Sequence, residues 1–331
     1  MKRSKSILVI KLSALGDFVM AFPAFACIRA AHPDARITLL TTAPFESLAR
    51  LSPYFDTVET DGRPTGPGDW LRLVTRLRQA KFDRVYDLQA NDRTNLLFQA
   101  LRPRPPVWSG VAIGCALPHR NPARAAMHPL ERQAQQLEDA GIWPEAPTAP
   151  LSAPPPDISW ILQRVRAKAR PRAQAPRPAA LLVPGSSVEH PEKRWPVEHF
   201  GRLAERLEAA GFDVLVVGGL QEGVLARGIQ RLAPRARDLT GRTDVAQIAA
   251  LGARAAVVIG NDTGPMHLIA AAGAPSIVLF SSASSPELSA PRGHVTVFQA
   301  ANLKDVSVDT VFASARSLAD VSKESALGQP S

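Results

Sequence analysis

The sequence has only two cysteines, Cys27 and Cys115, among its 331 residues. Neither belongs to a C-x-x-C pair and both stand among apolar residues, so we expect two buried, reduced thiols and no disulfide framework. Aromatic residues are also scarce, at 6% of the chain. Few of them stand between the arginines, whereas surfaces that bind single-stranded nucleic acid combine stacking rings with positive charge. We therefore expect no nucleic acid among the partners of this chain.

Several common motifs are absent as well. The sequence contains no G-x-G-x-x-G, no G-x-x-x-x-G-K-[ST] and no H-E-x-x-H, which removes the usual support for a dehydrogenase, a P-loop enzyme or a zinc protease. It also contains no D-x-D, and Glu59-Thr60-Asp61 is the nearest sequence to one. A metal ion on a bound diphosphate is therefore not required, and we expect neither a metal nor a cofactor.

Long hydrophobic runs are the third absence. No segment approaches the ~20 apolar residues that a membrane-spanning helix needs. Residues 1–26 imitate a signal peptide, but Lys11 and Asp17 interrupt its apolar part. We interpret residues 7–10 as a buried strand instead and expect a cytoplasmic protein.

Positive charge, in contrast, is abundant. The formal net charge is +9, from 39 Lys and Arg against 30 Asp and Glu. Much of the excess is arginine within residues 93–132 and 164–177. A basic protein of this kind favours nucleic acid, an anionic membrane surface or an anionic substrate. With nucleic acid disfavoured, we expect an anionic substrate and, through the arginines, peripheral contact with the inner membrane surface.

Short apolar runs alternate with helical patterns twice along the chain, which predicts α/β domains with parallel sheets and helices on both faces. The expected strands are residues 7–10, 37–41, 84–88, 107–110, 180–183, 214–217, 237–239, 256–259 and 276–280. The expected helices are residues 18–31, 45–51, 70–80, 91–101, 130–140, 158–169, 197–210, 245–253, one from 221 and one from 265. Pro23 should kink the first of these helices.

Proline-rich stretches mark the domain boundaries. Residues 144–156 and 171–178 flank a basic helical segment, so we expect a Pro/Arg-rich linker with a short helix at 157–178. The domains are then residues 1–156 and 179–321, followed by a polar, disordered tail at 322–331.

The most informative segment is residues 257–275, in which a strand runs through a polar turn into a helix of small residues. Backbone N–H groups at such a helix start, with the helix dipole, favour an anion such as phosphate. Asp262 and Thr263 are good capping types, and Gly264 and Pro265 open the helix. His267, one turn in, either donates to a phosphate or packs in the core.

Three further segments follow expected strands. In residues 11–17, Gly16 permits an unusual turn, and Asp17 either caps a helix or accepts a proton. Ser186 and Ser187 precede Lys193, either as a phosphate-binding loop or as an ordinary strand–helix connection. Glu222 either binds ribose hydroxyls or complements a helix N-terminus.

In their order and spacing, these segments resemble glycosyltransferases of family 9, the ADP-heptose:lipopolysaccharide heptosyltransferases. The likeness spans residues 7–293 and includes Asp87-Leu88-Gln89 and Ser109-Gly110. The resemblance implies the GT-B fold, an α/β architecture in which two Rossmann-like, doubly wound parallel-sheet domains face each other across a cleft. It places the acceptor on residues 1–156 and the nucleotide sugar on residues 179–321.

The resemblance also implies a reaction. It is the inverting, metal-independent transfer of heptose from ADP-heptose to an anionic, lipid-linked lipopolysaccharide core. By motif, Asp17 is the general base with Lys11 beside it, and Lys193 meets the charge of the leaving group. The remaining donor contacts implied are Ser186 and Ser187 with the diphosphate, Glu222 with ribose, Asp262 with sugar hydroxyls, and Thr263, Gly264 and His267 with phosphate and sugar.

The acceptor is less well specified by the sequence. Residues 93–128 are rich in Pro, Arg and His and do not follow the better-known members of the family closely. The cations expected to meet it are Lys11, Arg93 and Arg120, with Arg102, Arg104 and Arg124 as further candidates. Two other functions fit the same pattern: transfer from another nucleotide sugar or to another envelope acceptor, and nucleotide-sugar binding without catalysis. The presence of Asp17, Lys193 and Asp262 together argues against binding without catalysis, because a protein that only senses a nucleotide sugar needs no general base.

Overall fold

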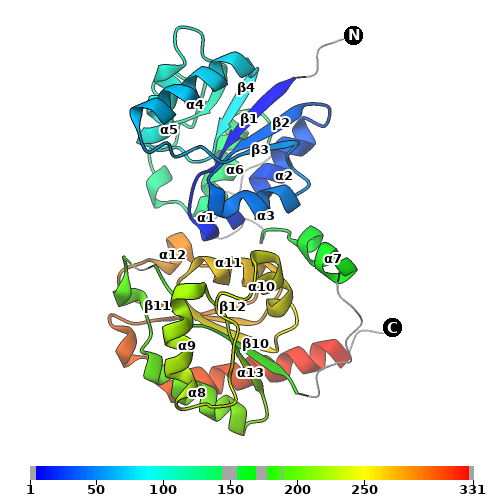
Figure 1. Ribbon diagram of the computed structural model, residues 1–331, viewed down its shortest axis with the longest axis vertical. Helices are drawn as coiled ribbons and strands as arrows, with labels where there is room; N and C mark the ends of the chain where they lie inside the picture. Colours follow the sequence, from blue (N-terminus) through cyan, green and yellow to red (C-terminus); the bar gives the residue numbers. More distant parts are fainter. Residues whose placement is uncertain (1–4, 144–154, 169–176, 188, 328–331) are drawn as a thin grey trace. The chain divides into compact units, whose positions relative to one another are not determined.

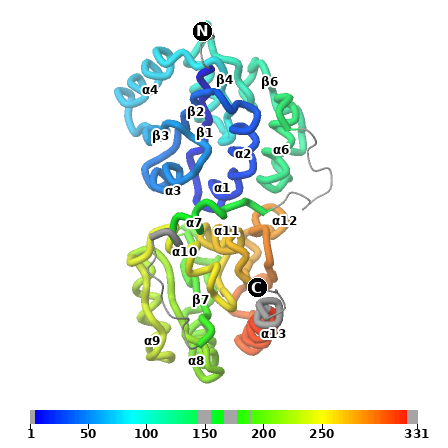
Figure 2. The backbone as a smooth tube through the Cα atoms, turned by 90° about the vertical axis from the view of Figure 1, so that its right-hand side faces the viewer, coloured from blue at the N-terminus to red at the C-terminus, as the bar shows by residue number. Residues whose placement is uncertain are grey.

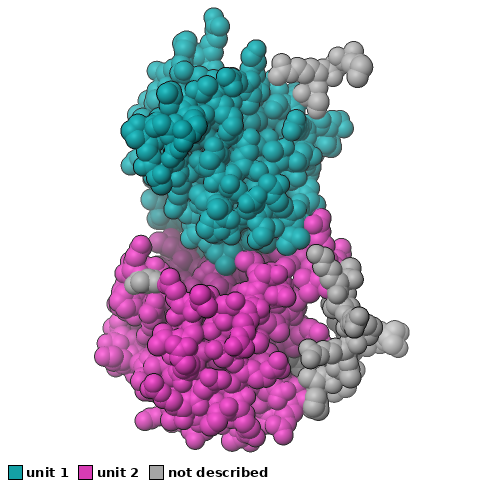
Figure 3. Space-filling view, in the orientation of Figure 1, with its two compact units in different colours: residues 1–156 teal, residues 157–331 magenta. Residues whose placement is uncertain are grey.

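The computed structural model describes residues 5–143, 155–168, 177–187 and 189–327. The chain forms two compact units, residues 1–156 and residues 157–331, which are coloured separately in Figure 3.

The first unit is built on a six-stranded parallel sheet with the order β3-β2-β1-β4-β5-β6. Its strands are β1 (Ser6–Ile10), β2 (Arg36–Leu40), β3 (Thr57–Glu59), β4 (Arg84–Asp87), β5 (Val107–Gly110) and β6 (Leu117–Pro118). Its helices are α1 (Leu15–Val19), α2 (Phe22–Ala31), η1 (Ala43–Phe45), α3 (Glu46–Leu51), α4 (Pro67–Ala80), α5 (Asp92–Ala100), η2 (Arg124–Ala126) and α6 (Pro129–Asp139). The strand order is that of a dinucleotide-binding fold.

Helices cover both faces of this sheet (Figure 1). α4 and α5 pack through Leu73, Leu77 and Phe98 against one face, while α2 and α6 contact each other on the other face. Figure 2 shows the strands between α4 and α6. β1 lies at the centre, with its residues 7–10 at most 1% exposed, and such two-sided burial explains why it reads as one continuous apolar run.

The second unit repeats the same design with the order β12-β11-β10-β7-β8-β9. Its strands are β7 (Ala179–Val183), β8 (Asp213–Val216), β9 (Arg237–Asp238), β10 (Val257–Asn261), β11 (Ser276–Phe280) and β12 (Val295–Gln299). Its helices are α7 (Ser159–Lys168), η3 (Pro191–Lys193), α8 (Val197–Ala209), η4 (Leu220–Glu222), α9 (Gly223–Gln230), α10 (Val245–Gly252), α11 (Gly264–Ala271), α12 (Pro286–Ser289), η5 (Leu303–Asp305) and α13 (Val308–Leu327). α8, α9 and α13 cover one face, and α10 and α11 cover the other.

The α/β fold with two doubly wound parallel sheets is therefore confirmed, and all nine expected strands are present to within two residues. The prediction of a single helix at residues 18–31 is wrong. It is divided into α1 and α2 because Pro23, at the start of α2, has no N–H to continue the helical ladder. β3, β6 and β12 were not predicted.

Two segments near the expected boundaries differ from the prediction. α7, expected in a linker, packs against α10 and so belongs to the second unit; residues 169–176 of that linker lie outside the described residues. The tail expected to be disordered from residue 322 is helical up to Leu327, because α13 continues through good helix-forming residues. The end of the tail, residues 328–331, lies outside the described residues.

Candidate functional site

In each sheet the strand order reverses between two central strands, β1 and β4 in the first unit and β7 and β10 in the second. Ligands of doubly wound sheets bind at the carboxyl ends of the strands at such a switch point. Residues 11–17 follow β1, residues 184–187 follow β7, and residues 262–264 follow β10. The predicted motifs thus lie where this fold binds ligands.

The central feature of the second unit is an ion pair between Lys193 and Asp262. The Lys193 Nζ donates to Asp262 Oδ2 at 2.9 Å, and the side chains are only 19% and 8% exposed. Lys193 ends η3, and Asp262 precedes Thr263, the N-cap residue of α11. A positive charge is therefore held beside a helix N-terminus, a combination that favours an anion.

Asn261, which the sequence analysis did not assign a role, organises this region. Its Oδ1 accepts the backbone N–H of Trp195 at 3.0 Å, and its Nδ2 donates to the Pro184 carbonyl at 2.8 Å. The side chain is fully buried at the end of β10. Asn261 therefore ties the loop after β7 and the start of α8 to the strand that carries Asp262.

We expect Asn261→Ala to destabilise the second unit by about 2–4 kcal/mol, because it leaves a buried N–H and a buried carbonyl unpaired. Asn302→Ala is the matched control. Asn302 is exposed and its side chain caps η5, so its loss should cost only about 1 kcal/mol. Urea denaturation followed by tryptophan fluorescence measures both. Equal losses from the two variants would show that the Asn261 bonds do not organise the region.

The two predicted serines differ in their surroundings. Ser186 is 6% exposed, and its Oγ contacts the carbonyls of Ser187 and His190. Arg194 donates to Ser186 Oγ at 3.0 Å and to its carbonyl at 3.2 Å. Ser187, in contrast, is exposed. Ser186 and Arg194 therefore shape the loop, and Ser187 is the hydroxyl that remains open to solvent.

Glu222 lies among glycines at the ends of β7 and β8. A Cβ at Gly185 or Gly218 would come within 2.8 Å of its side chain, and one at Gly219 within 3.0 Å of its Oε2. Any larger residue at Gly185 or Gly218 would displace the carboxylate. The glycines therefore let an acidic side chain lie against the ends of these strands, which fits the predicted ribose contact.

The helix that follows, α11, starts one residue earlier than expected, at Gly264. Thr263 is its N-cap residue, but the Thr263 side chain makes no capping hydrogen bond, and Asp262 pairs with Lys193 instead of capping. The helix packs closely on β10, because a Cβ at Gly260 would lie 2.6 Å from the sulfur of Met266. His267 is 6% exposed on this helix.

In the first unit, Lys11 and Asp17 belong to one charged cluster. Lys11 is 2% exposed and donates to the Leu88 carbonyl at 3.4 Å. Burial lowers the pKa of Lys11, which the carboxylates of Asp17 and Asp87 oppose and the Arg132 charge reinforces. Arg132, on α6, was not predicted; burial lowers its pKa and Asp17 opposes this shift. Because the helix begins at Leu15 with Ala14 as its N-cap, Asp17 lies in its first turn and does not cap it.

Asp87, at the end of β4, lies beneath this cluster. It is fully buried, and its Oδ1 accepts the N–H groups of Gln89 at 3.2 Å and Ala90 at 2.8 Å. Ala90 has a φ of 48°, a left-handed conformation that residues other than glycine rarely adopt. Gln89 joins the two switch-point loops by accepting from Leu12 N at 2.8 Å and donating to Ser13 Oγ at 3.1 Å.

Burial raises the pKa of Asp87 to about 6. The N–H groups and Lys11 favour the charged form and lower the pKa, but their effect is smaller than that of burial. The folded state therefore binds a proton more tightly than the unfolded chain, whose aspartates titrate near ~3.9. The Asp87 contribution to stability falls as pH rises from about 4 through 6, by on the order of 3 kcal/mol. Burial lowers the pKa of His32 and His119, which acts in the opposite direction.

The difference between wild type and Asp87→Asn isolates this effect. We expect the free energy of unfolding of Asp87→Asn to increase relative to that of wild type as pH rises from about 4 to 7. Urea midpoints measured at intervals of pH check it, and Asp309→Asn, which changes an exposed carboxylate, is the control. A difference that does not vary with pH would show that Asp87 titrates as an ordinary carboxyl.

The remaining predicted acceptor cations lie at both edges of the first sheet. Arg93 is the second residue of α5, which follows β4, and Arg120 follows β6. Both are therefore at the carboxyl edge, and both are exposed. Arg124, half-buried, interacts electrostatically with Arg132 and Asp87. Arg102 and Arg104 precede β5 and so lie at the amino edge, away from Asp17. The prediction that they contact the same site as Asp17 is therefore wrong. Asp17 lies at the carboxyl ends of the parallel strands, and the length of a strand separates it from Arg102 and Arg104 at the amino ends.

Comparison with known proteins identifies the family of this chain. The sequence profile of glycosyltransferase family 9 (heptosyltransferase) matches residues 70–308. The chain belongs to glycosyltransferase family 9. Asp17 and Lys11 precede the matched residues, whereas Lys193, Glu222 and Asp262 lie within them.

Full-length relatives of this family 9 glycosyltransferase extend the likeness. It is 27% identical to lipopolysaccharide heptosyltransferase 2 of Escherichia coli (strain K12) over 313 residues, which cover 87% of this chain and 86% of that one. The structure of the E. coli ADP-heptose lps heptosyltransferase II superposes with a TM-score of 0.78 at 23% identity over 96% of this chain and 99% of that one. E. coli heptosyltransferase WaaC with ADP gives 0.73 at 18% identity, over 95% and 99%. These structures confirm the fold class.

Among the described residues, no group of three or more His, Cys, Asp or Glu side chains is arranged to hold a metal ion. None of the helices in that part of the chain is both long and apolar enough to cross a membrane.

Proposed function

We propose that this enzyme transfers heptose from ADP-heptose to the inner core of lipopolysaccharide, with inversion at the anomeric carbon and without a metal ion. The acceptor hydroxyl attacks the anomeric carbon from the face opposite the diphosphate. The new glycosidic bond forms as the bond to the diphosphate breaks, and ADP leaves. Asp17 takes the hydroxyl proton.

The observation that carries this proposal is the Lys193–Asp262 ion pair at the N-terminus of α11. A diphosphate there would meet the Lys193 ammonium and the helix N–H groups as its charge develops. Preorganised donors of this type contribute about 3–4 kcal/mol each to transition-state stabilisation. Asp262, 8% exposed and anchored by Lys193, would accept hydrogen bonds from the sugar hydroxyls. Glu222, at the neighbouring strand ends, would hold the ribose.

Asp17 is the proposed base because it is the partly exposed carboxylate beside the cations at the switch point of the first unit, whereas Asp87 is fully buried. Lys11 and Arg132 both interact with it electrostatically. General-base catalysis contributes on the order of 10²–10⁴ in rate.

The same cations would bind the anionic acceptor. Lys11 and Arg132 place positive charge beside Asp17, and Arg124 interacts with Arg132 and Asp87. Burial makes each of these cations more costly to leave unpaired. Arg132 and Arg124 therefore join Lys11, Arg93 and Arg120 as proposed acceptor contacts. A carboxylate or phosphate on the core sugar is the group that such arginines recognise.

The test is an assay of ADP release from ADP-heptose with lipid cores truncated before the heptose. Release should require the acceptor and should persist in EDTA, and NMR of the product should show inversion at the anomeric carbon. Calorimetry measures binding of ADP-heptose separately. If ADP-heptose binds but no defined core causes release of ADP, the transferase proposal is overturned. Turnover from a different nucleotide sugar alone would correct the donor.

A further inference from the structure

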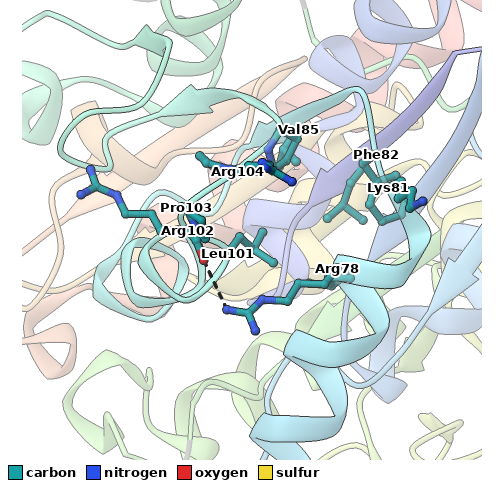
Figure 4. A pocket seen from close by; sticks show the side chains of 12 residues that line it. Arg78, Lys81, Phe82, Val85, Leu101, Arg102, Pro103 and Arg104 are labelled. Carbon is teal, nitrogen blue, oxygen red and sulfur yellow. Dashed lines mark hydrogen bonds between the residues drawn. The ribbon is translucent and has the colours of Figure 1, made fainter.

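A hollow of the first unit lies at the edge of the sheet opposite Asp17. It has a volume of about 630 Å³ and is lined by twelve residues, shown as sticks in Figure 4. Phe82 and Pro106 in its wall lie one or two residues before β4 and β5, and α4 and α5 end beside it. The hollow therefore lies at the amino ends of the strands, in a region that the transfer reaction does not use.

The floor of this hollow is apolar. Leu8, Leu77, Val85 and Leu101 are each at most 6% exposed, and half-buried Phe82 joins them. A purely ionic ligand would gain nothing from such a floor. A ligand with hydrocarbon next to its charge would gain about 0.8 kcal/mol for each CH₂ group buried.

The rim, in contrast, is cationic. It carries Arg78, Lys81, Arg102 and Arg104, and none of the twelve lining residues is acidic. Arg78 has a structural role at the end of α5: it donates to the Ala100 carbonyl at 2.5 Å and to the Arg102 carbonyl at 3.4 Å, the bond dashed in Figure 4. Arg102 and Arg104 lie beyond that helix end and are exposed, and neither forms an ion pair with a described residue.

An exposed apolar side chain lies next to this rim. Ile113 is 86% exposed, and its carbonyl accepts from Gln99 Nε2 at 3.2 Å. The following residue, Gly114, is so close to Arg102 that a Cβ there would lie 2.9 Å from the guanidinium. Apolar groups that project beside Lys and Arg are the combination that binds anionic bilayer surfaces.

We propose that this hollow binds the headgroup of an anionic phospholipid at a membrane surface. Arg102 and Arg104 pair with the phosphate, the apolar floor receives the adjoining glycerol and acyl carbons, and Ile113 enters the bilayer interface. The site is at the opposite edge of the sheet from Asp17, so the inference does not depend on the proposed transfer chemistry.

The first experiment measures binding of the full chain to vesicles of phosphatidylcholine, with and without about 30% phosphatidylglycerol, at ~0.15 M salt. Wild type should bind the anionic vesicles only. R102Q/R104Q should weaken this binding about thirtyfold, since each basic residue near an anionic surface contributes roughly fivefold. The matched control, R202Q/R231Q, removes the same charge from exposed positions of the second unit and should change binding by less than about twofold.

The second experiment separates a lipid from a free phosphate. Calorimetry with monomeric dihexanoyl phosphatidylglycerol should give affinity at least about tenfold higher than with glycerol 3-phosphate, because only the former reaches the apolar floor. Equal affinities would identify a phosphate site and overturn the lipid. The lipid proposal is also overturned if wild type binds both kinds of vesicle equally, or if R102Q/R104Q and R202Q/R231Q weaken binding to the same extent. R102Q/R104Q should turn over detergent-solubilised acceptor at the wild-type rate. This measurement distinguishes a failure of the lipid proposal from a failure of the transferase proposal.

Discussion

Asp17→Asn should lower turnover by at least about a hundredfold and leave the affinity for ADP-heptose unchanged. The amide keeps the size and the position of the side chain in α1 but cannot take a proton from the acceptor hydroxyl, and general-base catalysis contributes on the order of 10²–10⁴. Donor affinity should persist because the donor contacts proposed above all come from the second unit. Steady-state kinetics of ADP release and calorimetry with ADP-heptose measure the two quantities separately.

The alternative role of Asp17 is the stabilisation of a helix. An acidic residue in the first turn of a helix contributes about 0.3–1 kcal/mol, and Asp17 occupies such a position. Asp309→Asn makes the same exchange in the first turn of α13 and serves as the control. If Asp17→Asn lowers the melting temperature no more than the control and turnover remains near wild type, Asp17 is a helix residue and another group is the base.

Lys193→Ala should weaken ADP binding at least about tenfold and lower kcat by a further factor of roughly 10²–10³, the loss typical of a critical charge-stabilising donor. Two effects combine. The variant removes the cation that meets the leaving diphosphate, and it leaves the 8% exposed Asp262 carboxylate without its ion-pair partner, next to a bound anion. Removing one partner of a buried pair is more damaging than removing both.

The double variant Lys193→Ala/Asp262→Asn separates these effects. It should recover part of the ADP affinity, because the unpaired negative charge is gone, but none of the turnover. Lys193→Arg, which keeps the charge, should stay closer to wild type than Lys193→Ala. Lys304→Ala is the control, since Lys304 is exposed at η5. Kinetics of Lys193→Ala that match those of Lys304→Ala would remove Lys193 from the diphosphate site.

The sequence predicted the central strands well for a simple reason. β1, β7, β10 and β11 are buried on both faces, so each is a continuous apolar run between turn residues. β3 and β6 are only three and two residues long, too short to show any period. β12 has only partly buried and exposed residues, so it lacks a clear apolar signal.

The candidate site was predictable where its residues are neighbours in the chain. A strand, a polar turn and a helix start lie within a few residues of one another, which is why Asp17 and the 262–264 turn could be found by motif. Asn261 could not be given its role in this way, because its partners Pro184 and Trp195 are 77 and 66 residues away. Arg132 likewise meets Asp17 only through the packing of α6 on the first sheet.

The amino-acid sequence by itself determined the two α/β units and which segments follow their strands, because burial periodicity and turn chemistry are local properties of a chain. Tertiary structure decided which charges meet. It joined Lys193 to Asp262 across 69 residues, gathered Lys11, Asp17, Asp87 and Arg132, and separated Arg102 and Arg104 from them at the other end of the strands. Pairing, burial and the resulting pKa shifts depend on distances in space, which the order of residues does not contain.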